Sequence, residues 1–290
     1  MKQLDQVRRF LFEHNPIRGQ HVTLDSCWQQ IVEQSEAEGA ALVLLGQALT
    51  AATLLVETLK INGSISLQIR GKGAIHLLVA EATSRGTIRG VVRQNANIDE
   101  QQSLQQIFDS DKLVITIHNG NGKPHQGIVP LTGNELSVAL QSYFDQSEQL
   151  PTRIWLACDR DSASGLLLQR LPGESPDEDV WDRLLALADT TRHEELLGLE
   201  APQLLHRLFH QEDLRLFEPA AVTFACTCSC DRIRDMLVSL GKTEVESILK
   251  DEGEIAVTCE FCNASYVYDA VDLALLLNDS EFQPISPTRH

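Results

Sequence analysis

Cysteines are the residues of this 290-residue chain whose type and spacing could do chemistry. Cys226, Cys228 and Cys230 occupy alternate positions in FACTCSCD, and a second pair, Cys259 and Cys262, follows in CEFC. Thirty residues separate Cys228 from Cys259, so the fold must bring the pairs together if they share one site. Two close pairs supply four thiolates, and zinc accepts four such ligands at ~2.3 Å in a tetrahedron. The alternative to a zinc site is that these four cysteines are unrelated buried residues that bind no metal.

The C-x-C half of this pattern also indicates redox chemistry. Such a pair closes into a disulfide only across a very small ring, and strain of this kind makes a disulfide labile. Oxidation of a metal-bound thiolate to a sulfenic acid, followed by attack of the neighbouring thiol, would remove two ligands in one event. In small metallo-domains the metal-binding free energy, ~10–16 kcal/mol in apparent terms, is folding free energy. The pattern therefore predicts a module that unfolds on oxidation.

Other stretches that resemble catalytic motifs fail on residue identity. HEELL at His193 has Leu197 where a zinc protease needs its second histidine. DSASG has Ala163 at the nucleophile position, and RGKGAIH lacks the third glycine of a phosphate loop. Cys27 and Cys158 have no partner thiol nearby in sequence and are expected to be inert core residues. We therefore predict no enzyme and no catalytic residue.

Composition narrows the class of protein further. The net charge of −17 argues against nucleic acid as the main partner, because phosphate binding needs clustered Lys and Arg. An odd number of cysteines without a secretion signal does not indicate a disulfide framework. We also expect no apolar run of the ~18–20 uncharged residues that a membrane span needs. These features predict a cytoplasmic protein with no membrane partner.

The hydrophobic pattern predicts an α+β fold in three parts. Residues 1–175 are expected to form a mixed sheet-and-helix core domain whose first 60 residues are mostly helical, with VRRFLFEHN at the start and then GQALTAATLLVETLKI. Strand patterns follow in SISLQIRG, AIHLLVAEA, GTIRGVVR, LVITIH and QGIVPL. A further helix is expected at LSVALQSYFDQSEQ, and two more strands at TRIWLACD and GLLLQRLP.

The Pro/Gly/acid cluster LPGESPDED marks a boundary, and residues 176–225 form an acidic linker with eleven acids against four bases. Residues 180–217 show short amphipathic helical patterns that could be helical when packed yet easily unfolded; a plain helical connector is the alternative. Residues 226–290 are expected to form a small zinc-binding α+β module. It would contain two helices, two short strands flanking CEFC and a terminal helix at AVDLALLLND. A core this small would benefit from a metal.

The motifs CTCS at 226–229 and CEFC at 259–262, together with GEIAVTC, resemble the 33 kDa chaperonin family, the bacterial redox-regulated heat-shock holdases. The resemblance extends to LFEHNPIRG, YFDQSEQLPTR and EVESILKDEGEI, and so to most of the chain. It implies an ATP-independent chaperone whose reduced form holds one zinc ion and is inactive. It also implies that oxidation forms two disulfides, Cys226–Cys228 and Cys259–Cys262, releases zinc, and unfolds the module and the linker. The activated form would be a homodimer that binds unfolding proteins under oxidative stress.

The linker supplies candidate client-binding residues. If it melts, its leucines and phenylalanines become available to apolar client segments, while its acids keep the complex soluble. We single out four of these side chains: Leu204, Leu208, Phe209 and Phe217.

One residue departs from the family pattern, and two other classes of protein compete with the chaperone. Cys230 forms a second C-x-C with Cys228, 28 residues before Cys259, and could exchange with it after oxidation. A zinc-ribbon nucleic-acid module would need a basic face, yet residues 226–290 carry twelve acids against five bases. A thiol-disulfide oxidoreductase would need CEFC in a strand-then-helix setting, which the pattern lacks.

Overall fold

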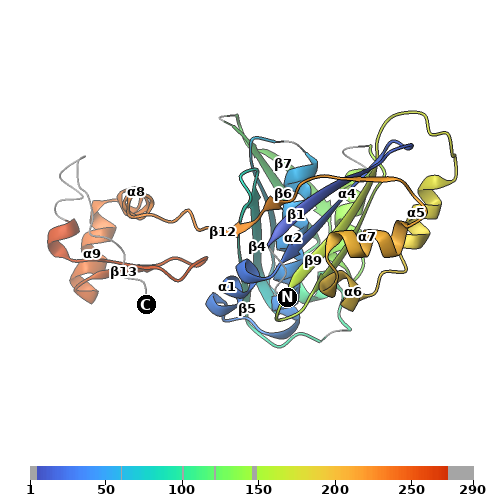
Figure 1. The fold of residues 1–290 in the computed structure, drawn as a ribbon. Helices are drawn as coiled ribbons and strands as arrows, with labels where there is room; N and C mark the ends of the chain where they lie inside the picture. Colours follow the sequence, from blue (N-terminus) through green and yellow to red (C-terminus); the bar gives the residue numbers. More distant parts are fainter. Residues whose placement is uncertain (1–4, 60, 100, 121, 146–148, 274–290) are drawn as a thin grey trace. The chain divides into compact units, whose positions relative to one another are not determined.

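The computed structural model describes residues 5–59, 61–99, 101–120, 122–145 and 149–273 (Figure 1). The chain divides into two compact units, Met1–Ala225 and Cys226–His290. Both contain helices and antiparallel strand pairs, which confirms the α+β class. The linker predicted at 176–225 lies within the first unit. Its separate unfolding, and hence the three-part division, stays a prediction.

Two six-stranded sheets, here called sheet A and sheet B, form the first unit. The strands of sheet A are β1 (Gln6–Phe12), β2 (Ile17–Leu24), β8 (Thr152–Cys158), β9 (Ala163–Arg170), β10 (Leu214–Leu216) and β11 (Ala220–Ala221). Those of sheet B are β3 (Gly63–Arg70), β4 (Ile75–Thr83), β5 (Thr87–Gln94), β6 (Lys112–Asn119), β7 (His125–Pro130) and β12 (Thr223–Phe224). Strands were thus correctly predicted in the middle of the chain.

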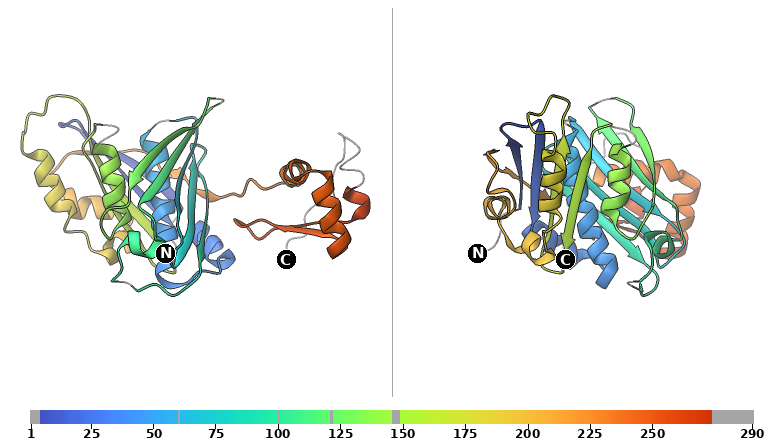
Figure 2. Two further views of the ribbon diagram at one scale, coloured as in Figure 1. Left: turned by 180° about the vertical axis from the view of Figure 1, so that it is seen from behind. Right: turned by 90° about the vertical axis from the view of Figure 1, so that its right-hand side faces the viewer.

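Helix α2 (Gly39–Thr58) lies between the two sheets and makes the main core with them (Figures 1 and 2). Its buried leucines and alanines pack against Val22 and Leu167 of sheet A and against Leu67 and Ala80 of sheet B. Three shorter helices complete this side of the unit: α1 (Ser26–Gln34), α3 (Leu104–Phe108) and α4 (Leu136–Tyr143).

Helix α2 corrects the sequence-based statement on apolar runs. Residues 39–56 carry no charge and are long and apolar enough for a membrane span, so the expectation that no such run exists was wrong. The reason is packing: in the helix Gly39–Thr58, 78% of an 18-residue apolar window is buried inside the unit. A helix enclosed between two sheets is apolar all round, as a membrane span is.

The opposite face of sheet A is covered by α5 (Val180–Ala188), α6 (His193–Gly198) and α7 (Ala201–Phe209) (Figure 2). These are the helices predicted in the linker. They form a second hydrophobic cluster, here called the linker cluster, with Phe10, Phe12 and Leu166 of the sheet. The rings of Phe12 and Phe209 meet edge to face with centroids 5.4 Å apart.

Three segments in regions predicted to be helical are strands. VRRFLFEHN contributes β1, residues 17–24 form β2, and the end of the linker contributes β10. Sheet A is buried on both faces, so apolar side chains of β1 point both ways, with Val7 toward α2 and Phe10 toward the linker helices. A strand buried on both sides loses the polar/apolar alternation that identifies it.

The second unit contains α8 (Cys230–Leu240), α9 (Lys242–Glu252) and a hairpin of β13 (Ile255–Thr258) and β14 (Ser265–Tyr268). The described part of its core is small, with these buried hydrophobic residues: Leu237, Val245, Ile255, Tyr266, Tyr268 and Leu273. Residues 270–273 begin the predicted terminal helix, and the rest of that prediction lies outside the described residues.

Candidate metal centre

The hairpin of the second unit positions one pair of cysteines. Cys259 and Cys262 lie in the turn between β13 and β14, where the Cys259 amide donates to the Ala264 carbonyl at 2.9 Å. The Asn263 amide donates to the Cys259 carbonyl at 2.8 Å. Asn263 has φ 52°, in the left-handed region that asparagine tolerates better than most residues. This turn follows from the sequence CNAS and places both thiols at one end of the hairpin.

The other pair precedes helix α8. Cys226 and Cys228 lie in a segment without regular secondary structure that ends at Ser229, the N-cap of α8. The Ser229 hydroxyl accepts a hydrogen bond from the Arg232 amide at 3.2 Å. The two thiols of this C-x-C pair lie within 4.8 Å of each other. The cap fixes where extended backbone gives way to helix.

The four cysteines converge on one point. The Sγ atoms of Cys226 and Cys259 are 3.6 Å apart, those of Cys228 and Cys262 are 3.3 Å apart, and all four lie within 4.8 Å of one another. A tetrahedral zinc with four sulfur ligands at ~2.3 Å requires sulfur atoms about 3.8 Å apart. The donor set and its spacing therefore fit a metal ion that accepts four thiolates.

Burial affects the acidity of these thiols unequally. It raises the pKa of Cys226 and of Cys262 above the ordinary thiol value. Burial acts in the same direction on Cys228, but hydrogen bonds from Tyr266 and from the neighbouring thiols outweigh it and lower the pKa of that thiol. One cluster thus holds thiols of different acidity.

Tyr266 is a functional candidate that the sequence reasoning missed. Its hydroxyl donates to the Cys228 Sγ at 3.2 Å, from the buried face of β14. Metal ligands are commonly oriented by such hydrogen bonds from residues behind them. The available signal was the alternation in SYVY, which directs Tyr266 and Tyr268 to the same face of the hairpin.

Cys230 lies outside the four-thiol group. It is the first residue of α8 and packs against the small core of the second unit. The Tyr268 hydroxyl donates to its backbone carbonyl at 3.4 Å. None of the seven cysteines, all within the described part of the chain, is in a disulfide. The pairing on oxidation is therefore untested, as are the ligand roles.

The two remaining cysteines are in the first unit. Cys27 is 2% exposed and Cys158 is 3% exposed, which confirms the expectation of buried core residues. Burial raises the pKa of both thiols, and the carboxylate of Asp5, 3.0 Å from the Cys27 Sγ, adds to the effect there. Thiols held in the protonated form are poor nucleophiles.

The predicted client-binding residues are also in the first unit. Leu204, Leu208 and Phe209 lie in α7 and are buried in the linker cluster. Phe217 follows β10 and is 36% exposed, with the guanidinium of Arg9 6.0 Å from its ring centroid. Three of the four side chains are thus covered in this state and would need the linker helices to move before they could meet a client.

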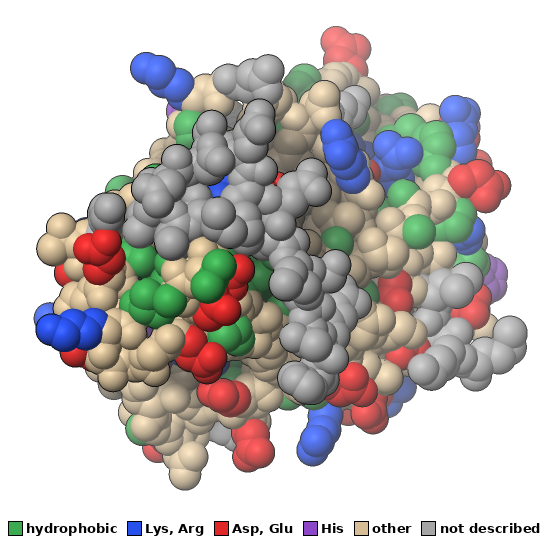
Figure 3. Space-filling view, turned by 90° about the vertical axis from the view of Figure 1, so that its left-hand side faces the viewer, with side chains coloured by type: hydrophobic (Ala, Val, Ile, Leu, Met, Phe, Trp, Pro, Cys, Tyr) green, Lys and Arg blue, Asp and Glu red, His purple; other side chains and the backbone are tan. Residues whose placement is uncertain are grey.

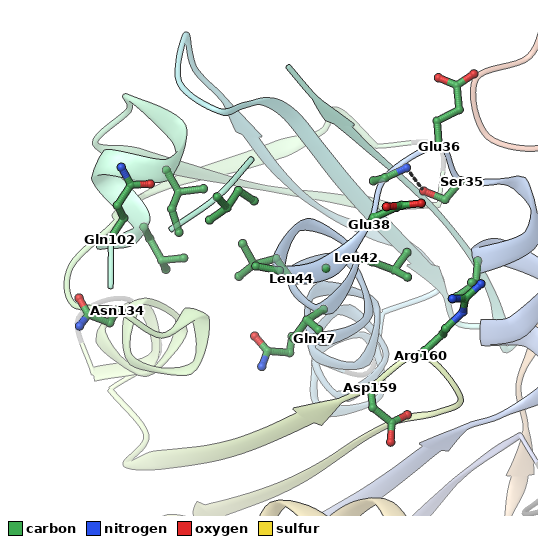
Figure 4. Close-up of a pocket in the computed structure, with 18 residues that line it drawn as sticks. Ser35, Glu36, Glu38, Leu42, Leu44, Gln47, Gln102, Asn134, Asp159 and Arg160 are labelled. Atoms are coloured by element: carbon green, nitrogen blue, oxygen red, sulfur yellow. Dashed lines mark hydrogen bonds between the residues drawn. The ribbon is translucent and has the colours of Figure 1, made fainter. Parts of the chain in front are cut away.

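The first unit also contains a cavity of about 810 Å³ beside the start of α2 (Figure 4). Leu42, Leu44 and other apolar side chains line it, and the carboxylates of Glu36 and Asp159 lie far apart on its rim. Acid–base or nucleophilic catalysis needs groups within hydrogen-bond reach of one another. The only hydrogen bond drawn between lining residues joins the Ala37 amide to the Ser35 hydroxyl at 3.2 Å. This bond joins a backbone amide to a neighbouring side chain and does not pair an acid with a base.

The protein thus belongs to the class that combines a two-sheet unit with a small module in which four cysteine thiols lie close enough to bind one metal ion. The family model described as "Hsp33 protein" matches residues 5–269. The chain is 43% identical over the whole length of both chains to a 33 kDa chaperonin of Nitrosococcus oceani. It is 43% identical to one of Shewanella frigidimarina, over 95% of this chain and 96% of that one. The chain therefore belongs to the Hsp33 family.

A solved structure shares the fold. The crystal structure of the 33 kDa chaperonin from Thermotoga maritima superposes with a TM-score of 0.80, covering 94% of this chain and 98% of that one, at 24% sequence identity. Family membership confirms the resemblance drawn from the cysteine motifs and supports chaperone function.

Proposed function

We propose that this protein is a redox-regulated, ATP-independent holdase that is inactive while reduced and loaded with one zinc ion. The observation that carries the proposal is the convergence of Cys226, Cys228, Cys259 and Cys262 within 4.8 Å. Zinc would be held by these four thiolates and would supply the cross-link that a module with few buried apolar residues needs.

The activating step is an oxidation in which each pair loses two electrons. A thiolate attacks a peroxide oxygen and becomes a sulfenic acid while the other oxygen leaves as water, and the neighbouring thiol then displaces hydroxide to form the disulfide. Two peroxide molecules give two bonds, Cys226–Cys228 and Cys259–Cys262. The sulfur contacts across the pairs leave other pairings possible, Cys230 included, so peptide mapping of the oxidised chain by mass spectrometry tests this assignment.

Loss of all four ligands would unfold the module, and the linker helices would follow. Leu204, Leu208, Phe209 and Phe217 would then become exposed beside eleven acids of the linker. Apolar contacts would bind partly unfolded clients, and the charge would keep the complex in solution. The activated form would be a homodimer, acting in the cytoplasm and without catalysis.

Two other functions fit less well. A nucleic-acid module would show a basic stripe, whereas on the face drawn in Figure 3 the described Lys and Arg side chains are scattered among Asp and Glu. A thioredoxin-like oxidoreductase would carry its C-x-x-C at the start of a helix, whereas Cys259 and Cys262 lie in a hairpin turn.

The test is a parallel measurement of zinc release, helix content and client aggregation before and after peroxide treatment at raised temperature. We expect one zinc per chain to be released, helix content to fall, and protection of an aggregating client to appear at stoichiometric protein. Full protection by the reduced, zinc-loaded protein would contradict the proposal. Insulin reduction at substoichiometric protein would instead favour the oxidoreductase.

A further inference from the structure

The last residues of the first unit cover an edge of each sheet. This segment, residues 213–225, is here called the strap. It contributes β10 and β11, which pair with β1, and then β12, which pairs with β5. Without the strap, β1 would be the outermost strand on its side of sheet A. A row of unpaired backbone donors and acceptors is a template for another extended chain.

Main-chain hydrogen bonds hold the strap along the whole of β1. The Phe217 amide donates to the Arg9 carbonyl at 2.9 Å, and the Glu13 amide donates to the Asp213 carbonyl at 2.9 Å. Further along, the Val222 amide donates to the Asp5 carbonyl at 3.0 Å. The backbone amides and carbonyls of the odd-numbered residues of β1 therefore point toward the strap, while those of the even-numbered residues point toward β2.

Side chains hold the strap much less firmly. Val222 is the one buried side chain among its residues, all of which the structure describes. Leu214 and Leu216 pack at the margin of the linker cluster, and Phe217 lines a cavity of about 340 Å³ with Leu11 and Leu171. Segments with few buried apolar contacts and exposed backbone hydrogen bonds open at low free energy.

The strap is also tied by sequence to the metal centre, because Cys226 follows its last residue. While the module is folded, Cys226 and Cys228, which follow the strap in the chain, are held in the thiol cluster. The other end of the strap is anchored by α7, whose residues Leu208 and Phe209 are buried in the linker cluster. Release of the module and of α7 would leave only the short strand pairings.

We propose that the outer edge of β1 is a client-binding surface, which the strap occupies at rest and an extended segment of an unfolded protein occupies after activation. Strand addition of this kind draws its affinity from main-chain hydrogen bonds, so it accepts many sequences. The strap itself indicates the preferred client chemistry: apolar side chains at alternate positions, as Leu214 and Leu216 supply, with a basic residue between them. Arg215 pairs with Glu13 through two contacts of 2.7 and 2.9 Å.

This inference rests on the proposed function, and amide exchange followed by NMR in the full-length chain separates the two. In the reduced protein the Leu11 and Glu13 amides, which face the strap, should be protected. On oxidation they should lose protection, and a saturating unfolded client should restore it. The Phe10 and Phe12 amides face β2 and are the matched controls, expected to stay protected throughout. Leu11 and Glu13 amides that remain exposed with client bound would overturn the inference.

Peptide competition tests the main-chain contacts directly. A peptide with the sequence EDLRLFE, residues 212–218, should suppress client protection by the oxidised protein when it is in millimolar excess over the client, because a single strand pairing of this length is weak. The same peptide N-methylated at the amides of Arg215 and Phe217 should be weaker by about tenfold or more, because two main-chain hydrogen bonds are lost. Equal inhibition by both peptides would overturn the inference.

Two further outcomes separate the hypotheses. If neither peptide competes while the oxidised protein still protects its client, the edge is not the client surface and the proposed function stands. If the oxidised protein protects no client, the proposed function fails first. A charge exchange adds a specificity test: Glu13→Arg should weaken competition by the native peptide by about threefold and favour a peptide with Glu in place of Arg215. No change of preference would overturn the client chemistry inferred here.

Discussion

The two units of this protein are held together by different means. The first encloses a long apolar helix between two sheets, with a second apolar cluster under the linker helices. The second has, among residues 226–273, six buried hydrophobic side chains and a cluster of four thiols. Hydrophobic burial does not respond to oxidants, whereas thiolate ligation does. Under the proposed function, the difference teaches that one chain would combine a stable scaffold with a module whose folding depends on the redox state of cysteine.

The largest expected effect comes from removing one thiol ligand. Cys259→Ser should abolish binding of one zinc per chain and unfold residues 226–273, because the metal-binding free energy of such modules, ~10–16 kcal/mol, is folding free energy. The first unit should keep its fold. Metal analysis and two-dimensional NMR measure both results. Cys230→Ser, outside the four-thiol group, is the matched control and should keep its zinc. Loss of zinc in that variant would show that Cys230 is one of the ligands.

A smaller effect is expected in the linker cluster. Leu204 is fully buried in α7, so Leu204→Ala should lower the free energy of unfolding of the linker helices by about 2–5 kcal/mol. Zinc binding should be unchanged, and client protection should appear at milder oxidation. Denaturant unfolding and aggregation assays measure these changes. An unchanged activation threshold would indicate that the linker cluster does not restrain activity.

The linker docking should also depend on pH through His21. This residue of β2 is buried, and its Nε2 lies 3.2 Å from the Ser164 hydroxyl, with a further hydrogen bond to the backbone of Leu196 in α6. Burial lowers its pKa from 6.5 to about 4. The unfolded form therefore takes up the proton first as pH falls, so this contribution is complete above about pH 6.5 and is lost toward pH 4.

The first unit should accordingly lose roughly 2 kcal/mol of stability between pH 8 and pH 5 through this one group. Denaturant unfolding at each pH measures the slope. His21→Gln should flatten it. An unaltered slope in the His21 variant would show that this group does not titrate between the folded and unfolded forms.

The smallest expected effect concerns the hydrogen bond behind the metal centre. Tyr266→Phe removes the hydroxyl that donates to Cys228 and should weaken zinc binding by about fivefold, or about 1 kcal/mol. Competition with a chelator measures the change in affinity. Tyr268→Phe, whose hydroxyl donates to a backbone carbonyl instead, is the control. Equal effects in both variants would assign the loss to packing.

The cysteine cluster could be predicted from the sequence because spacing within each pair limits which thiols can share one centre. Tyr266 was missed: the alternation in SYVY indicates which face of the hairpin it occupies, but a hydrogen bond to sulfur leaves no spacing signal. The strands of sheet B showed alternation because their outer side chains, such as Ser64 and Ser66, are less buried than Ile65 and Leu67. β1 was mistaken for a helix because both of its faces are buried, and β10 because its pairing partner lies at the other end of the chain.

The pairing of β1 with β10 determines how late in synthesis the edge of β1 can be covered. Phe10 of β1 is in register with Leu216 of β10, so the outer edge of β1 has no native partner until the ribosome has made nearly the whole first unit. At about 5–20 residues per second, the edge stays open for about 10–40 s. Each new copy of the protein therefore presents, before it is finished, the same unpaired strand that it is inferred to offer its clients. Its own nascent chains are then among the extended segments that a finished, activated copy could bind.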